Sequence, residues 1–347
     1  MGTDLSDRQR LILKLVIQEY IRTGRAVGSK ALIDRYQLDV SPATVRNEMV
    51  ELEERSYLQH LHTSAGRVPT DQGYRYYVEY LVDDPVLSPA EQIMIRHQFR
   101  QTEMHVESWA KLAAAVLADV SGNLSLVTPA RGRVERLRHF ELTGIRDRVV
   151  LMIVVTQSGS VREVVLPVLE SVDQDQLSAV SRRLNPEIRN RSSRAIAERA
   201  RQETRLSALA LRSVADALRA IEEQNRSEVY YEGLDLALNQ PEFSRGPNAR
   251  RLVELLRGGA ILSALLPQLH VDEDLQVFIG SENRSEDLRP FGVVVGTYGV
   301  NMDVTGILGV LGPTRMSYER SISTVRYLAR VLSDLMQTIY AYDAPGT

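Results

Sequence analysis

Three hydrogen-bonding residues near the start of one predicted helix could contact the edges of nucleic-acid bases. Arg46 and Asn47 are adjacent, and Thr44 precedes them on the same turn. An arginine can bond guanine at two atoms, an asparagine can do the same with adenine, and a threonine can contact the methyl group of thymine. Together with Ser41 at the helix start, these residues predict a surface that contacts bases in the major groove. The alternative is an ordinary surface helix, because amphipathic helices that begin with proline are common.

The segment that carries these residues has the pattern of a helix with one buried face. Ser41 suits the N-cap, and Pro42 suits the first helical position because its missing N–H would have no partner there. Apolar residues follow at i, i+4 and i+7, namely Val45, Met49 and Leu52. If that face packs inward, the hydrogen-bonding residues face outward.

The sequence on either side of this helix predicts a winged helix-turn-helix. Upstream, a capping box at Ser6 and Gln9 begins the first of two further helices. Downstream, residues 57–61 predict a strand and residues 64–67 predict a turn from which Arg67 projects. The chain then continues into a second strand. Three helices followed by a hairpin is the order of that fold, with Arg67 at the tip of the wing. Arg67 is predicted to contact the minor groove or the DNA backbone, and Lys30 and Arg75 are predicted to bind phosphate.

Composition indicates a chain of about two or three domains, since it has 347 residues and 44% hydrophobic residues. Cysteine is absent, which excludes disulfides and thiolate chemistry. No apolar run could span a bilayer, and the N-terminus lacks an apolar signal core, so a cytoplasmic protein is expected. The net charge is -3, and residues 1–80 hold 11 basic and 11 acidic residues. Any nucleic-acid contact must therefore depend on a few well-placed cations.

The rest of the chain predicts a sheet with helices packed on it. Residues 124–128, 139–142, 149–156 and 161–167 have strand character, and residues 149–155 (VVLMIVV) are so apolar that both faces should be covered. Residues 172–240 are arginine-rich and helical, which fits either an interaction module or a helix with a solvated face. Strand-like segments return between residues 275 and 311, before a last amphipathic helix.

The sequence offers no residues to carry catalysis. His60 and His62 lie two apart on a predicted strand, but two ligands without a third are a weak metal signal. The glycines between Gly292 and Gly312 are not followed by the lysine of a phosphate-binding loop, so they predict tight turns and close packing. No nucleophile motif or paired carboxylates are present. We therefore expect no enzyme, no metal and no cofactor.

Four segments closely resemble the bacterial heat-inducible transcription repressor family, HrcA. They are VGSKALIDRY, SPATVRNEMVELEERSYL, HTSAGRVPTDQGYRYYV and GILGVLGPTRMSYERSI. The resemblance implies an α+β, multidomain protein with an N-terminal winged helix-turn-helix and a GAF-like α/β sheet domain interrupted by an inserted dimerising domain. The expected boundaries are 1–82 for the winged helix, 83–171 and 241–343 for the GAF-like domain, and 172–240 for the insert.

The resemblance also implies a function. Members of the family are homodimeric repressors that bind a double-stranded DNA inverted repeat called CIRCE, upstream of chaperone operons, and the GroEL chaperonin supports their activity until heat diverts it. Two alternatives remain open. One is a regulator whose GAF-like pocket senses a small metabolite. The other is an interaction scaffold without specific DNA binding, which the neutral N-terminal segment would permit.

Overall fold

The chain divides into two compact units in a computed structural model. The model describes residues 5–60, 66–82, 86–103, 105–132, 134–243, 247–270, 273–300 and 304–342. The first unit comprises Met1–Thr128, Val229–Gly299 and Gly306–Thr347, and the second comprises Pro129–Glu228 and Val300–Thr305. Because the chain leaves the first unit and returns to it, the second unit is an insertion. The protein is therefore an α+β chain of more than one domain.

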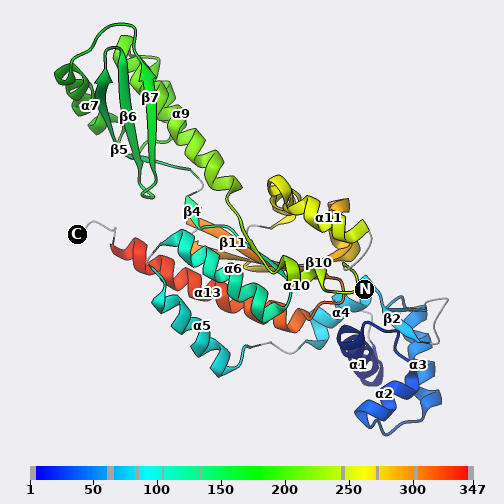
Figure 1. The fold of residues 1–347 in the computed structure, drawn as a ribbon. Helices are drawn as coiled ribbons and strands as arrows, with labels where there is room; N and C mark the ends of the chain where they lie inside the picture. Colours follow the sequence, from blue (N-terminus) through cyan, green and yellow to red (C-terminus); the bar gives the residue numbers. More distant parts are fainter. Residues whose placement is uncertain are drawn as a thin grey trace. The chain divides into compact units, whose positions relative to one another are not determined.

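The N-terminal part of the first unit has three helices followed by two antiparallel strands (Figure 1). These elements are α1 (Asp7–Thr23), α2 (Ser29–Tyr36), α3 (Pro42–Glu54), β1 (Leu58–His60) and β2 (Arg67–Pro69). In the β1–β2 pair, Leu58 lies opposite Pro69 and His60 lies opposite Arg67. Residues 61–65, which include His62 and the first two residues of the predicted turn, lie outside the described part of the chain.

Local signals in the sequence explain where these helices begin and end. The predicted capping box is present, since Ser6 accepts from the backbone of Gln9 and the Gln9 side chain accepts from Ser6. Gly24 ends α1 with φ 64°, a left-handed conformation that glycine adopts without a steric penalty. The core between the helices is apolar and buried; it includes Ile12, Leu13, Val16, Leu32, Val45, Met49 and Leu52.

A short helical segment follows the two strands. α4 (Asp71–Tyr76) begins at the N-cap Thr70 and continues directly into a π-helical turn, η1 (Tyr77–Leu81). A Cβ atom added to Gly73 would lie 2.2 Å from the carbonyl oxygen of Tyr57. Only glycine therefore allows α4 to approach the backbone just before β1 this closely.

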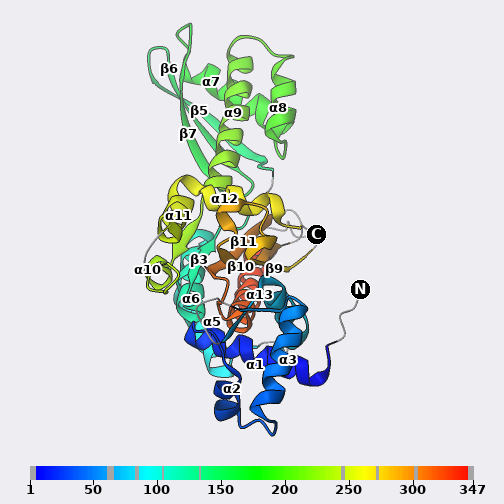
Figure 2. The same ribbon diagram turned by 90° about the vertical axis from the view of Figure 1, so that its right-hand side faces the viewer.

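The remainder of the first unit is a sheet with helices on both faces (Figures 1 and 2). The strand order is β8-β3-β11-β10-β9, from β8 (Tyr230–Glu232), β3 (Leu124–Val127), β11 (Val304–Pro313), β10 (Phe291–Val300) and β9 (Leu275–Ile279). α6 (Val106–Ser121) and α13 (Tyr318–Tyr342) pack together against one face, beside α5 (Pro89–Gln101). α10 (Leu234–Leu238), α11 (Pro247–Leu256) and α12 (Ala260–Leu265) share a buried cluster with the other face. Short 3-10 turns occur at Arg257–Gly259, Leu266–Gln268, Gly280–Glu282 (η4) and Glu286–Leu288.

The second unit has its own sheet and its own core. β5 (Leu137–Arg146), β6 (Val149–Thr156) and β7 (Val161–Pro167) pair antiparallel in sequence order. One face packs on α7 (Gln174–Ile188), α8 (Ser193–Ala200) and α9 (Arg205–Ser227) through a continuous buried cluster. β4 (Arg131–Gly132) pairs with the first residues of β11. None of the helices in the described ranges combines the length and apolar composition that a membrane span requires.

The placement of β5–β7 differs from the sequence-based expectation of one central sheet. Among the described strands these three pair only with each other, and they pack on the helices that follow them in sequence. The expected boundaries at 171/172 and 240/241 therefore do not coincide with the limits of the compact units, 129 and 228. The expectation that β6 is covered on both faces is also wrong, because its residues alternate between buried and half-exposed.

An ion-pair network holds the helices of the second unit together. Both carboxylate oxygens of Glu203 accept from Arg183 of α7, at 3.0 and 2.9 Å, and one also accepts from Arg199 of α8 at 2.8 Å. Arg199 also donates to Glu187 of α7. Hydrogen bonds from Arg183 and then Arg199 lower the pKa of Glu203 from its ordinary value of 4.5 to about 2.

This lowered pKa predicts an acid-sensitive contribution to stability. Because the folded pKa lies below the unfolded pKa, the contribution is fully present above pH 4.5 and is lost as the pH falls towards 2. We expect Glu203→Gln to lower the free energy of unfolding at pH 7 and to flatten its decline in that acid range. Urea titrations at a series of pH values measure both effects. Glu198→Gln, which loses only an exposed pair with Arg194, is the matched control. An equal response of the two variants would contradict this role for Glu203.

Candidate nucleic-acid interface

The residues predicted to contact bases lie on the exposed face of α3. Arg46 and Asn47 are exposed and Thr44 is half-buried, whereas Val45, one position from each of Thr44 and Arg46, has no exposed surface. Within the described ranges, no residue hydrogen-bonds or ion-pairs with the side chain of Arg46 or Asn47. Their polar groups are therefore available to a ligand, and the helix N-terminus beside them adds a positive partial charge.

Ser41 has a structural role at the start of the same helix. Its Oγ accepts a hydrogen bond from the Thr44 backbone N–H at 3.1 Å, and it lies 2.9 Å from Thr44 Oγ1. The predicted N-cap is therefore confirmed. Since the Ser41 hydroxyl is already occupied by the cap and by Thr44, Arg46 and Asn47 remain the stronger candidates for base contact.

Arg67 lies in a strand and is not free to project from a turn as the sequence analysis expected. It is the first residue of β2, and its backbone exchanges hydrogen bonds of 2.9 and 2.8 Å with Val27. Its Nε donates to Glu53 Oε2 of α3 at 2.8 Å, and only 12% of its side chain is exposed. The expected geometry is wrong because Glu53 and the segment before α2 both hold this residue. Its contact with DNA stays an untested prediction that would require the pair with Glu53 to open.

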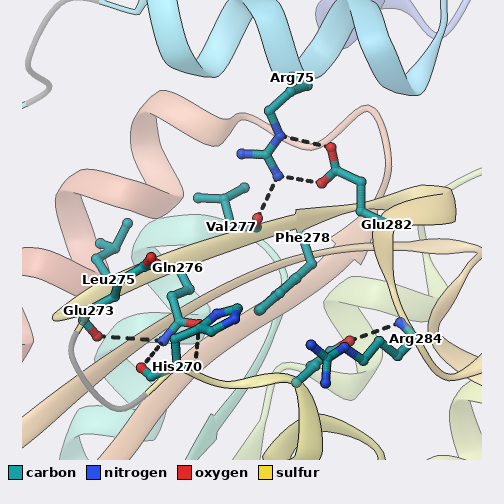
Figure 3. Close-up of a pocket in the computed structure, with 10 residues that line it drawn as sticks. Arg75, His270, Glu273, Leu275, Gln276, Val277, Phe278, Glu282 and Arg284 are labelled. Atoms are coloured by element: carbon teal, nitrogen blue, oxygen red, sulfur yellow. Dashed lines mark hydrogen bonds and ion pairs between the residues drawn. The ribbon is translucent and has the colours of Figure 1, made fainter.

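Arg75 is also held by a carboxylate, and this partner comes from the far end of the chain. Its Nε donates to Glu282 Oε1 at 2.8 Å, its Nη2 contacts Glu282 Oε2, and Nη2 also donates to the Val277 carbonyl at 2.6 Å (Figure 3). The hydrogen bond to Glu282 is the main reason that the pKa of Arg75 is raised. A phosphate would have to compete with Glu282, so the predicted phosphate contact of Arg75 finds no support in its surroundings.

Other cations of the N-terminal part divide into paired and unpaired groups. Arg22 and Arg35 both pair with Glu19, and the hydrogen bond from Arg22 lowers the pKa of that carboxyl group. Lys30 at the start of α2 is exposed, and no residue in the part of the chain that the structure describes hydrogen-bonds or ion-pairs with its side chain. Because the internal pairs neutralise several arginines, the positive charge that remains available includes Lys30 on α2 and Arg46 on α3, two helices that pack together.

A second candidate site is a cavity of about 470 Å³ beside strand β9. Arg75, His270, Gln276, Phe278, Glu282 and Arg284 are among the residues that line it (Figure 3). Both signs of charge and one aromatic ring are present, so the lining does not select one class of ligand. The described histidines and carboxylates include no group of three that could hold a metal ion.

Sequence reasoning missed the residues that hold the two arginines. No motif in the sequence singles out Glu53 or Glu282, nor Asp71 and Ser281, which make a further contact beside Arg75. Asp71 Oδ2 accepts hydrogen bonds from the N–H and Oγ of Ser281, at 2.8 and 2.7 Å. A local signal for Asp71 existed, since an acidic residue directly after the N-cap Thr70 favours a helix start. No local pattern indicates its contact with Ser281.

The chain is similar to proteins named heat-inducible transcription repressors. It is 53% identical to the "Heat-inducible transcription repressor HrcA" of Thermomicrobium roseum, over 98% of this chain and 97% of that protein. It is 44% identical to the protein of the same name from a Roseiflexus species, over 99% and 98% of the two chains. A crystal structure described as a hypothetical protein has a similar fold, with a TM-score of 0.59 and 23% identity over 96% of this chain and 98% of the other.

The family match also covers the part of the chain beyond the N-terminal helices. Residues 107–322 match the family described as "HrcA protein C terminal domain", and they include the sheets of both units apart from the two short strands β1 and β2. The two relatives extend the similarity through α3 to nearly the whole length. The chain therefore belongs to the HrcA family of heat-inducible transcription repressors.

Proposed function

We propose that this chain is a cytoplasmic, sequence-specific repressor that binds DNA through residues 1–82, folded as a winged helix-turn-helix. The observation that supports this most directly is the face of α3, where Arg46 and Asn47 are exposed without partners among the described residues while the opposite face is buried. In this proposal α3 enters the major groove, where Thr44, Arg46 and Asn47 contact bases. Lys30 binds phosphate. Arg67 would contact DNA only after its pair with Glu53 opens, and Arg75 would bind phosphate only in competition with Glu282.

The first measurement is a gel-shift titration at a stated salt concentration, comparing a duplex with the CIRCE inverted repeat and a scrambled duplex. Wild type is expected to prefer the repeat. Replacing Arg46 or Asn47 by Ala should cost about 1–3 kcal/mol of binding free energy and relax specificity at one base position. Arg55→Ala is the matched control, since Arg55 is exposed at the other end of α3. Unchanged selectivity in both variants would remove these residues from the interface.

An inverted repeat calls for a two-fold dimer, and we propose that the second unit supplies the contact. On β6, Leu151, Ile153 and Val155 face away from the core and are half-exposed. Their neighbours on β7 include Val161 and Val165, which are 62% and 60% exposed. This second sheet face is mixed, since Glu163 and Glu141 lie opposite Ile153, but its apolar side chains are left uncovered in the described part of the unit, whereas α7–α9 cover the first face. A second copy of the chain is the occupant proposed, because the same face on both copies gives a closed two-fold pair.

A charge placed on this face should prevent dimer formation. We expect Val161→Asp and Val165→Asp to shift the protein from dimer to monomer, because a carboxylate buried against apolar residues without a partner is costly. Gln202→Asp adds the same charge at an exposed position outside the sheet and should leave the dimer intact. Sedimentation velocity over a range of concentrations gives the oligomeric state. Dimers in all three variants would place the contact elsewhere.

The heat response is proposed to depend on the GroEL chaperonin, as the family resemblance implies. A repressor of limited stability is lost on heating, and a partner that binds it shifts the fraction that remains active. We expect a heated sample to lose operator binding and to retain more of it when chaperonin is present. Gel shifts after a timed heat step, with and without chaperonin, measure this. Full operator binding after heating without chaperonin would overturn the switch while leaving the repressor function in place.

The cavity beside β9 keeps a second candidate function open. If the first unit's sheet is a GAF-like domain, a small metabolite in this cavity could set the affinity for DNA. The cavity has the volume of a small-molecule site, and charged and aromatic residues line it, so it favours a ligand-binding role over a purely structural one. A calorimetric screen for ligands, followed by operator titrations with any that bind, distinguishes a metabolite sensor from the chaperonin-dependent switch.

A further inference from the structure

Arg75 joins the N-terminal helices to the sheet of the first unit. It projects from α4 to the end strand β9, where it contacts the Glu282 carboxylate and the Val277 carbonyl (Figure 3). Glu282 in turn accepts a hydrogen bond from the Ile279 N–H at 2.8 Å. Because β9 is the last strand in the sheet order, none of the described strands pairs with its outer side. The Arg75–Glu282 pair therefore occupies two backbone groups of this strand as well as linking the two parts.

Asp71, one turn earlier on α4, makes a second link that does not involve an arginine. Its carboxylate accepts from the N–H and hydroxyl of Ser281 in η4. Gly280 has φ 53°, and a Cβ atom there would lie 2.4 Å from Asp71 Oδ1. The turn before Ser281 is thus shaped to admit the carboxylate, which indicates a fitted contact. We call the contacts of Asp71 and Arg75 with Val277, Ser281 and Glu282 the α4 clasp.

Buried aromatic residues lie behind the clasp. The rings of Tyr74 and Tyr318 are 5.7 Å apart, and both side chains are almost completely buried. Tyr77 Oη donates to Glu319 at 2.7 Å, and Arg315 Nη1 donates to the carbonyl of Ile21 at 3.1 Å. The N-terminal helices are therefore fixed both in orientation and in distance from the sheet. The contacts that fix them run from α1, α4 and η1 to α13 and the segment before it.

We propose that Asp71 and Arg75 are positioning residues: through the α4 clasp they fix α3 relative to the sheet and so set the half-site spacing that a dimer accepts. This rests on the proposed function, because spacing has meaning only for a dimer on an inverted repeat. Each base pair added between half-sites moves one of them by about 3.4 Å along the duplex. A dimer with rigidly held recognition helices discriminates against such a change, and one with loosely held helices tolerates it.

The clasp and a phosphate contact predict different behaviour for Arg75. If Arg75 bound phosphate, its loss would weaken binding equally at all spacings and reduce the salt slope by about 1. If it positions α3, its loss weakens binding mainly at the preferred spacing and leaves the salt slope unchanged. Asp71 sharpens the distinction, because a carboxylate cannot bind phosphate favourably, and yet its loss should reproduce the spacing defect.

The experiment titrates full-length protein with operators whose half-sites are moved by single base pairs, at several salt concentrations. We expect Arg75→Glu, Glu282→Arg and Asp71→Ala each to weaken binding at the preferred spacing by about tenfold, a usual size for coupling between sites. The difference in affinity between the preferred spacing and the other spacings should become smaller in each variant. The double variant Arg75→Glu with Glu282→Arg re-forms the pair with the charges exchanged, and it should recover much of the discrimination. Arg22→Ala, which loses a pair within α1, is the matched control.

Each other outcome has a definite meaning. Three results together would assign Arg75 to phosphate and overturn the proposal. They are no recovery in the double variant, a lowered salt slope in Arg75→Glu, and normal behaviour in Asp71→Ala. Tighter operator binding in the single variants would also overturn it, since the clasp would then oppose DNA binding. Ser281→Ala, which keeps the backbone N–H, provides a milder break if Asp71→Ala fails to fold. Failure of wild type to prefer the inverted repeat would refute the proposed function itself.

Discussion

The burial of one face of α3 is the constraint on which the candidate interface depends. Val45, Met49 and Leu52 have at most 1% of their surface exposed, and α1 and α2 pack against this helix. Successive residues of a helix are rotated by about 100°, so fixing these three positions also fixes the direction of every side chain between them. Arg46 and Asn47 are exposed for this reason, and the cap at Ser41 sets where the helix begins.

Features encoded within one helix could be predicted from the sequence, and features that join distant segments could not. The caps at Ser6 and Ser41 and the buried stripe of α3 depend on residues within one or two turns of each other. The partners of Arg67 and Arg75 lie 14 and 207 positions away. Arg46 and Arg75 are both arginines on helices, and only the tertiary structure shows that one is unpaired among the described residues while the other is held by Glu282.

The strands of the second unit also show that the sequence does not predict contacts between distant segments. The run VVLMIVV places apolar side chains on both faces of β6, because successive side chains alternate across the sheet. Composition shows that both faces favour burial, but it does not identify what buries them. Here α7–α9 cover one face, and the other remains exposed with Val161 and Val165 beside it. In the proposed dimer, a second copy of the chain covers this other face.

The α4 clasp offers a physical route from heating to loss of repression. Its ion pair is partly exposed, and the buried hydroxyl of Tyr74 behind it finds no hydrogen-bond partner among the described residues, which costs about 1–3 kcal/mol. Contacts of this kind between parts of a chain allow relative motion. Opening the clasp would free α3 from its set position and would leave Val277, on end strand β9, without its side-chain donor. Since unpaired strand edges promote association with other chains, a single opening event would both remove the geometry that DNA binding needs and create a species prone to aggregate.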